Sequence, residues 1–395
     1  MTNSFKIFKA IDHYIGLPIC VVISAIYGLY RFIFGVPQKP INPKNILIIK
    51  FFGLGSIGYS TLIARNLKKQ YPACKFFLLT FYENRAFADN LQVFDEILTV
   101  EKRAWHLFVA DTIKFLIRCL NSPFDICIDL EFFSKYTSML TAATRAPQRI
   151  GFFLNCFWRR FIYTDHSYFN TAKHVSFFYS MIADLSGVNQ PDQKPAALHI
   201  KPEDSLSVNQ KLLSLGWDGN QGIVGININA SDLALGRRWP LDRFRELIEA
   251  VAKDGFLVCM TGASSERKYV QTCMQGLAES TQKSAINLAG QIDLNEFIAL
   301  LKMLKLFVTN DSGPMIFSIL ADAASVSIWG PGDLKMYGGS PPLHTYCYSA
   351  FPCSPCMYIP NTDAGFFCGR KYPCMAAIQA KDVIFEVRRR LGMGN

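Results

Sequence analysis

Residues Asn45–Gly58 read NILIIKFFGLGSIG, an apolar β-branched run that ends in a glycine-rich turn. Consecutive aliphatic residues are typical of a parallel strand that is buried on both faces. The glycines permit a tight turn, and a helical pattern follows them. A strand, a tight turn and a helix in this order form the first unit of an α/β domain.

The same alternation of short apolar runs and amphipathic helices continues, and it starts again in the second half of the chain. We expect strands at NILIIKF, KFFLLTF, EILTV and FDICIDL, and then at IVGININ, FLVCMTG, AINLAG, LFVTND and SVSIWG. Residues 189–204, rich in Pro, Lys and Gln, separate the halves. We therefore predict an α/β protein with two doubly wound, Rossmann-like domains facing a cleft, over 45–188 and 204–395.

A hydrophobic segment over residues 1–40 precedes these domains. From Tyr14 to Val36 the chain is apolar for about the length of a bilayer crossing, but Pro18 and Arg31 interrupt it. Basic residues flank the segment at Lys6, Lys9 and Lys39. Three interpretations stay open: an anchor on the cytoplasmic membrane surface, a transmembrane span, and a helix packed on the body of the protein. We predict a membrane-associating segment and a cytoplasmic location at the inner membrane.

The charge and cysteine content indicate which partners and which cellular compartment to expect. The 41 basic and 31 acidic residues give a formal charge of +10, which suits a nucleotide, a phosphorylated sugar or an acidic membrane surface. The basic residues form no compact tract with interleaved aromatics, so we expect no nucleic-acid partner. Most of the twelve cysteines stand singly in apolar runs, which indicates a reducing cytosol.

The first glycine-rich turn has two interpretations. Gly53, Gly55 and Gly58 match the pattern G-x-G-x-x-G at the start of a predicted helix. Such a turn can bind NAD or FAD, which makes an NAD-dependent oxidoreductase the rival prediction. It can equally hold another anionic ligand at the helix N-terminus, or only allow tight packing.

Four segments of the second half follow predicted strands, where open α/β sheets bind ligands. Their candidate binding residues are Asn229, Arg237, Arg238, Glu266, Asp311, Ser312 and Gly313. Paired guanidiniums suit a pyrophosphate, and backbone N–H groups at a helix start suit phosphate oxygens. A solvated arginine pair, an exposed first-turn glutamate and a plain helix cap are the alternatives without a ligand. The fourth segment, WGPGD at 329–333, brings another loop to the same edge.

In order and spacing, these motifs resemble glycosyltransferase family 9, the family of the lipopolysaccharide heptosyltransferases. The resemblance runs from about residue 45 to the C-terminus through GLG, RWP, TG-x-x-x-E, NLAG, NDSGPM, GPGD and PCSPC. It implies a GT-B fold with acceptor binding mainly in the first domain and donor binding mainly in the second. It also implies metal-independent, inverting transfer. Arg237 stands in the place of a family lysine that binds donor phosphate, and Glu266 in that of an acidic residue near the nucleoside. Asp311, Ser312 and Gly313 match the donor-binding loop.

Two positions depart from the family pattern. Ser56, in the acceptor-side loop, stands where the family usually has an aspartate that acts as general base, and serine cannot do this unaided at neutral pH. Either Glu83, Asp129 or Glu131 serves as the base, or the acceptor and chemistry differ, or transfer activity is lost. Ile316 stands where the family often has a histidine near the donor phosphates, which puts ADP-heptose as the donor in question.

The C-terminal region holds cysteines whose spacing is compatible with a structural zinc ion. They are Cys353, Cys356, Cys368 and Cys374. An unliganded packing cluster and disulfides are the alternatives, and we expect no other cofactor.

Together these features predict an inverting glycosyltransferase. It would move heptose or another sugar from a nucleotide-sugar donor to lipopolysaccharide or another lipid-linked envelope glycan. Arg237 and Arg238, with the backbone N–H groups at Ser312 and Gly313, would stabilise the departing diphosphate. A catalytically impaired member that binds a nucleotide sugar or glycan, and the oxidoreductase, remain the alternatives.

Overall fold

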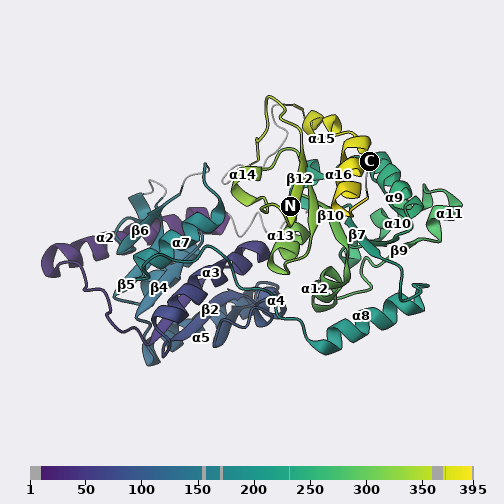
Figure 1. Cartoon of the computed structure of the whole chain (residues 1–395). Coiled ribbons are helices and arrows are strands. Elements are labelled where there is room, and N and C mark those ends of the chain that lie inside the picture. Colours follow the sequence, from purple (N-terminus) through teal and green to yellow (C-terminus); the bar gives the residue numbers. More distant parts are fainter. Residues whose placement is uncertain are drawn as a thin grey trace. The chain divides into compact units, whose positions relative to one another are not determined.

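The chain forms two units, Met1–Ala196 and Ala197–Asn395, shown in Figure 1. The boundary between them falls inside the segment 189–204 that separates the two halves of the sequence. This computed structural model describes residues 10–153, 157–169, 172–230, 232–357, 368–369 and 371–393. Lys6 and Lys9, which flank the predicted membrane segment, lie outside the described residues.

The first unit contains a six-stranded sheet in the order β3-β2-β1-β4-β5-β6, and all neighbouring strands are parallel. The strands are β1 (Asn45–Ile49), β2 (Lys75–Phe81), β3 (Glu96–Val100), β4 (Ile126–Asp129), β5 (Gln148–Phe153) and β6 (Asp165–Tyr168). The strand order reverses between β1 and β4. The carboxyl ends of these two strands therefore form the switch point at which such sheets bind ligands.

Helices cover this sheet on both faces, as the right-handed crossovers of parallel strands require. They are α2 (Gly16–Phe34), α3 (Leu54–Gln70), η1 (Tyr82–Asn84), α4 (Arg85–Asp89), α5 (Trp105–Asn121), α6 (Lys135–Ala143), η2 (Phe157–Arg159) and α7 (Val175–Leu185). Helix α3 packs against α7, and α6 contacts both α2 and α5. The predicted hydrophobic N-terminal helix is thus present as α2, and it packs on α6 and η2.

The second unit repeats the topology, with the order β12-β11-β10-β7-β8-β9 and parallel pairing throughout. Its strands are β7 (Ile223–Asn227), β8 (Leu257–Met260), β9 (Ala285–Asn287), β10 (Leu306–Asn310), β11 (Ser325–Trp329) and β12 (His344–Tyr348). Its helices are α8 (Pro202–Ser214), η3 (Asp232–Arg237), α9 (Leu241–Lys253), η4 (Ser264–Glu266), α10 (Arg267–Gln275), α11 (Glu279–Gln282), α12 (Leu294–Met303), α13 (Gly313–Leu320), α14 (Leu334–Tyr337), α15 (Pro373–Ala377) and α16 (Ala380–Arg390). The switch point lies between β7 and β10.

The central strands carry the cores of both units. Every residue of β7, β10 and β11 is buried, and so are the aliphatic residues of β1. Burying each large aliphatic side chain contributes about 1.5–3 kcal/mol to folding. Each strand that the sequence predicts is present, which confirms two doubly wound α/β sheets. The prediction missed three outer strands, β5, β6 and β12.

Candidate functional site

Asparagine side chains tie together the carboxyl ends of the two central strands of the second unit. Asn310 Nδ2 donates to the carbonyls of Ile228 and Asn229, at 3.1 Å each, and its Oδ1 accepts from the Trp239 amide at 3.1 Å. Asn227 Oδ1 accepts from the Asn229 amide at 3.1 Å. All of these groups are buried, so the bonds fix the loop after β7 and the start of the RWP segment.

A pocket of about 390 Å³ opens at this edge of the sheet, large enough for a small-molecule ligand. It is lined from the ends of β7 and β8, from η4 and from the starts of α12 and α13. The lining residues are Asn227, Asn229, Ala230, Thr261, Gly262, Ala263, Glu266, Ile292, Asp293, Leu294, Phe297, Ser312, Gly313, Pro314 and Phe317. Four residues predicted from the sequence therefore meet in one pocket: Asn229, Glu266, Ser312 and Gly313.

Asn229 presents an unpaired amide to this pocket. Its side chain is only 2% exposed, and neither Oδ1 nor Nδ2 has a hydrogen-bond partner among the described residues. Leaving such a group unpaired costs about 1–3 kcal/mol. Gly262 keeps the space beside it open, because a Cβ there would lie 2.9 Å from Asn229 Nδ2 and 3.0 Å from Glu266 Oε2. The arrangement suits a ligand that both donates to and accepts from an amide.

The N-terminus of α13 forms another wall of the pocket. Ser312 is the N-cap residue, with extended backbone, and Gly313 is the first helical residue. In the described part of the chain, neither of their N–H groups donates to a protein acceptor. A Cβ on Gly313 would meet nothing within 4 Å, so the space in front of the helix is open. Free N–H groups and the positive end of the helix dipole favour an anion here.

The predicted charged residues Arg237, Arg238 and Asp311 do not line the pocket. Arg237 Nη1 lies 3.5 Å from Asp311 Oδ1 in an ion pair that is largely shielded from solvent. Burial raises the pKa of the Asp311 carboxyl, and the charge of Arg237 opposes this. The guanidinium of Arg238 lies over the ring of Tyr269 at 4.5 Å, and its Nη2 is 3.4 Å from the carbonyl of Ala230, a lining residue.

An apolar wall of the pocket was not predicted. Phe297 and Phe317 lie edge to face with ring centroids 6.1 Å apart, and Ile292 and Leu294 line the same pocket. Both rings are almost fully buried. In the sequence these residues look like the apolar face of an ordinary core helix, so only the position of their helices at the switch point reveals them.

In the first unit, the glycine-rich turn opens α3. Gly53 is the N-cap residue with φ +83°, a left-handed conformation that favours glycine. Gly55 and Gly58 lie in the first turns of the helix together with Ser56, which is half-buried. A Cβ on Gly53 would lie 3.4 Å from Ser56 Oγ, so the Ser56 hydroxyl faces the turn.

Glu131 holds the loop that leads into this turn. Its Oε1 accepts from the amides of Phe51 and Phe52 at 2.8 and 2.9 Å. Lys50 Nζ lies 3.1 Å from the same oxygen, and both side chains of this ion pair are nearly buried. Of the three proposed replacement bases, Glu131 is therefore the one that contacts the loop before Ser56. The role of Lys50 was missed, because a lysine after a strand gives no signal of burial.

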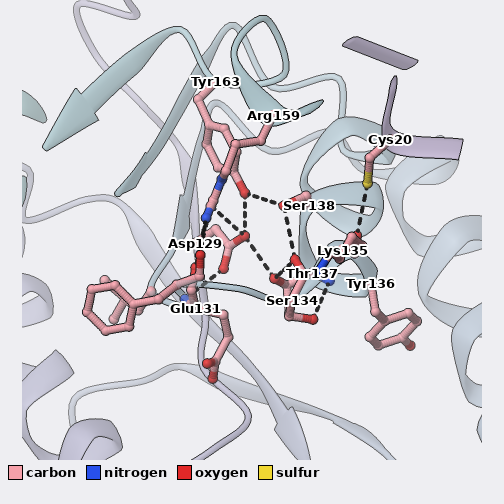
Figure 2. A network of polar contacts seen from close by, with 12 residues as sticks. Cys20, Asp129, Glu131, Ser134, Lys135, Tyr136, Thr137, Ser138, Arg159 and Tyr163 are labelled. Atoms are coloured by element: carbon pink, nitrogen blue, oxygen red, sulfur yellow. Dashed lines mark hydrogen bonds and ion pairs between the residues drawn. The ribbon is translucent and has the colours of Figure 1, made fainter. Parts of the chain in front are cut away.

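Asp129 lies at the centre of a buried network, shown in Figure 2. Its Oδ2 accepts from Tyr163 Oη at 2.5 Å and from Thr137 Oγ1 at 2.9 Å, and its Oδ1 accepts from the Glu131 amide at 2.9 Å. Arg159 Nη2 lies 3.7 Å from Oδ2. Burial raises the pKa of Asp129, while the charge of Arg159 and the bond from Tyr163 lower it. Both carboxylate oxygens of Asp129 accept hydrogen bonds, and the residue is not exposed to solvent. We therefore interpret Asp129 as a structural residue.

Glu83, the remaining alternative, lies in η1 after β2 and is exposed. It forms an ion pair with Lys102 at 2.5 Å. In the described part of the chain, its side chain contacts Lys102 and not the loop of Ser56.

The C-terminal cysteines do not form a metal site in the described part of the chain. No group of three or more His, Cys, Asp or Glu side chains with suitable geometry occurs among those residues. Cys374 is buried, and burial raises the pKa of its thiol to about 11, so it is held as a thiol. The zinc interpretation of Cys353, Cys356, Cys368 and Cys374 is thus not supported there, and Cys374 packs instead against Gly330.

Comparisons with known proteins agree with the motifs. The sequence pattern of glycosyltransferase family 9 (heptosyltransferase) matches residues 113–365. Lipooligosaccharide heptosyltransferase 2 of Haemophilus ducreyi is 28% identical over 163 residues, 40% of this chain and 47% of that protein. The protein of the same name from Haemophilus influenzae is 28% identical over 113 residues, 29% of this chain and 32% of that protein. The chain thus spans about half the length, or less, of the curated relatives it matches.

Solved structures show the same fold. A glycosyl transferase family 9 protein from Veillonella parvula has a TM-score of 0.78 at 19% identity, covering 90% of this chain and 100% of that one. The E. coli ADP-heptose LPS heptosyltransferase II has a TM-score of 0.69 at 17% identity, covering 88% and 98%. The predicted GT-B fold is confirmed, and the family match decides against the oxidoreductase. The chain belongs to glycosyltransferase family 9, a family of glycosyltransferase enzymes that includes the heptosyltransferases.

Proposed function

We propose that this chain is an active, inverting glycosyltransferase. It moves a sugar from a nucleoside diphosphate sugar, bound in the pocket of the second unit, to a lipid-linked glycan of the lipopolysaccharide or lipooligosaccharide type. Family membership and the names of the relatives support the reaction class and the acceptor class. The observation that carries the donor site is the buried, unpaired amide of Asn229 in a pocket that also contains the start of α13.

The polar side of the pocket suits the diphosphate. The free N–H groups of Ser312 and Gly313 can donate to phosphate oxygens, and the Asn229 amide can bond to the same group or to the sugar. Arg237 and Arg238 add positive charge behind the lining residues. These groups need no reorganisation when charge develops on the leaving diphosphate, which is the arrangement that stabilises a transition state most effectively.

The apolar side suits the nucleoside. The rings of Phe297 and Phe317 offer a surface for a planar base. Glu266 Oε2 accepts from the Ala263 amide at 2.7 Å, which fixes the carboxylate at the pocket wall, where it can also accept from a ribose hydroxyl. A solved relative, an E. coli heptosyltransferase, is described with ADP, and we propose an ADP-sugar as the first donor to test.

The proton of the acceptor hydroxyl requires a base, and we assign Glu131. The hydroxyl oxygen attacks the anomeric carbon from the face opposite the diphosphate. Its proton passes to the Glu131 carboxylate, and the bond from the sugar to the diphosphate breaks. Glu131 Oε1 is occupied by Lys50 and two loop amides, whereas Oε2 has no hydrogen-bond partner among the described residues. Ser56, in the first turn of α3 after this loop, would orient the acceptor hydroxyl.

The donor site is tested by nucleotide binding to the full chain. We expect one of ADP, GDP, UDP or CDP to raise the melting temperature, since a ligand at about 100 times its Kd stabilises by about 2.7 kcal/mol. Asn229→Ala should lower the affinity for this nucleotide at least about 10-fold, which corresponds to a loss of roughly 1.4 kcal/mol of binding free energy. Because the mutation removes an unpaired buried group, it should not lower the stability of the free protein.

Asn220→Ala provides the matched control, since Asn220 is exposed in the same unit. It should leave the affinity unchanged. Failure of every nucleotide to bind folded protein would refute the donor site. Binding without any sugar transfer would favour the catalytically impaired alternative, which the serine at position 56 motivates.

A further inference from the structure

Helix α2 carries an uncovered apolar stripe. The helical segment Ala10–Phe34 is interrupted only by a turn at Ile15. Large side chains recur at steps of four and three residues along one side and are between 41% and 61% exposed: Ile15, Ile19, Val22, Ile26, Leu29 and Ile33. Steps of four and three place them on one face of the helix. A stripe of this length on the surface calls for an apolar partner.

The opposite face of α2 is fixed to the first unit by polar contacts along its length. Ser24 Oγ accepts from the Phe161 amide at 3.2 Å, Tyr27 Oη donates to the Ala142 carbonyl at 2.8 Å, and Arg31 Nη2 donates to the Tyr163 carbonyl at 2.6 Å. In the helical turn before α2, Asp12 Oδ1 accepts from the Tyr136 amide at 2.8 Å. Cys20 and Ser24, in the middle of this face, are buried. The helix is therefore part of the first unit.

These contacts decide between the three interpretations of the N-terminal segment. A transmembrane helix needs about 20 residues within the hydrocarbon layer. Protein contacts at Asp12, Ser24 and Arg31 leave no stretch of that length free. A purely internal helix is equally excluded, because the stripe is exposed. What remains is a helix that lies along the protein and offers one side to a partner.

The surroundings of the stripe favour a lipid surface as that partner. No acidic residue occurs from Tyr14 to Val36. The neighbouring element η2, which packs against α2, exposes Phe157 by 71%, and Arg160 and Phe161 follow it. Aromatic rings and cations beside an apolar face are typical of the interface of an anionic bilayer.

We propose that α2 is an interfacial membrane helix. Its axis lies in the plane of the bilayer, the stripe from Ile15 to Ile33 enters the apolar layer, and Arg160 meets anionic headgroups. The proposal does not depend on the sugar-transfer reaction, since none of these residues lines the donor pocket.

Flotation of the full chain with vesicles of phosphatidylethanolamine and phosphatidylglycerol tests this surface. The wild type should float, and Val22→Glu with Ile26→Glu should reduce the floated fraction at least about 10-fold. Ile113→Glu with Leu120→Glu on α5 is the matched control. These side chains are 49% and 65% exposed, and the charge change is the same. The control should float like the wild type, and thermal unfolding verifies that both variants are folded.

Depth measurements test the orientation. Ile19→Trp, Ile26→Trp and Ile33→Trp place a fluorophore near the first end, in the middle and at the last residue of the stripe, and the wild-type signal is subtracted. A helix in the plane of the bilayer gives equal quenching by lipids brominated near the headgroup. Deeper quenching at position 26 alone would indicate a span and overturn the proposal. A wild type that does not float, an equal loss in the α5 control, or a soluble dimer that Val22→Glu with Ile26→Glu converts to monomer would also overturn it.

Discussion

Asp129 and Glu131 are two residues apart at the end of β4, but their carboxylates have different surroundings. Both oxygens of Asp129 accept hydrogen bonds inside the unit, whereas the bonds to Glu131 use one oxygen. The first arrangement stabilises the fold, and the second leaves one carboxylate oxygen open, as the proposed general base requires. This difference could not be predicted, because the two residues look alike in the sequence ICIDLE.

Glu131→Gln should reduce kcat at least about 100-fold, the lower range for loss of a general base, while nucleotide affinity stays unchanged. The free energy of unfolding should fall by about 3 kcal/mol, because Lys50 keeps a buried charge without its partner. Adding Lys50→Met should restore most of the stability but none of the activity. Steady-state transfer assays measure kcat, and urea unfolding measures the free energy of unfolding. Recovery of kcat in the double variant would show that Glu131 is not the general base.

Asp129→Asn should show the opposite pattern. It leaves the buried Arg159 without its anion, so the free energy of unfolding should fall by about 3 kcal/mol. The kcat of the folded fraction should stay within a few-fold of the wild type. A large loss of kcat at unchanged stability would instead place Asp129 in the reaction.

At the scale of elements, periodicity predicted the strands that contain a continuous apolar run, including the edge strands β3 and β9, and missed those that lack one. The missed strand β5 is buried between β4 and β6, but it begins with Gln148 and Arg149. β6 reads DHSY and β12 reads HTYCY, and such edge strands bury one face at most, so they lack a continuous apolar run. The residues that line the pocket were also only partly predictable. Those at strand ends could be predicted from the topology, whereas Phe297 and Phe317 resemble core residues on the apolar faces of α12 and α13.

The edge strand β12 should make stability depend on pH. His344 pairs with Ser325 of β11, and its Nδ1 lies 2.9 Å from Ser325 Oγ. Burial lowers the pKa of His344 to about 4. Below its usual value near 6.5, the unfolded chain binds a proton that the folded chain does not, so stability falls as the pH drops from about 6.5 to 4.

The loss should amount to about 3 kcal/mol, from 1.36 kcal/mol for each pKa unit. His344→Asn retains an acceptor for Ser325 without a titrating ring, and it should flatten the dependence of the unfolding free energy between pH 6.5 and 4.5, measured in urea at about five pH values. The exposed His199→Asn should leave the slope as it is. A slope that persists in His344→Asn would assign it to other groups.

At the scale of the whole molecule, the chain repeats one topology, and each unit has its own sheet and core. The two copies differ in what they place at the switch point. The first has a buried ion pair beneath a glycine-rich turn, and the second has an unpaired amide and an open helix N-terminus. The proposed donor site thus consists of residues of one unit only, since every residue that lines the pocket lies between Asn227 and Phe317.

This division predicts that residues 197–395 alone fold and bind the nucleotide. The large hydrophobic core of this unit consists of its own residues, including those of the C-terminal helix α16. Cutting the chain at the boundary between the units therefore removes no residue of this core. We expect the Kd of the isolated unit to lie within about 10-fold of that of the full chain, a change of at most roughly 1.4 kcal/mol. Transfer should be lost, because Glu131 and Ser56 belong to the first unit. Calorimetric titration, with Asn229→Ala in the same fragment as the control, measures this. If the fragment unfolds cooperatively but does not bind the nucleotide, the first unit must supply part of the donor site.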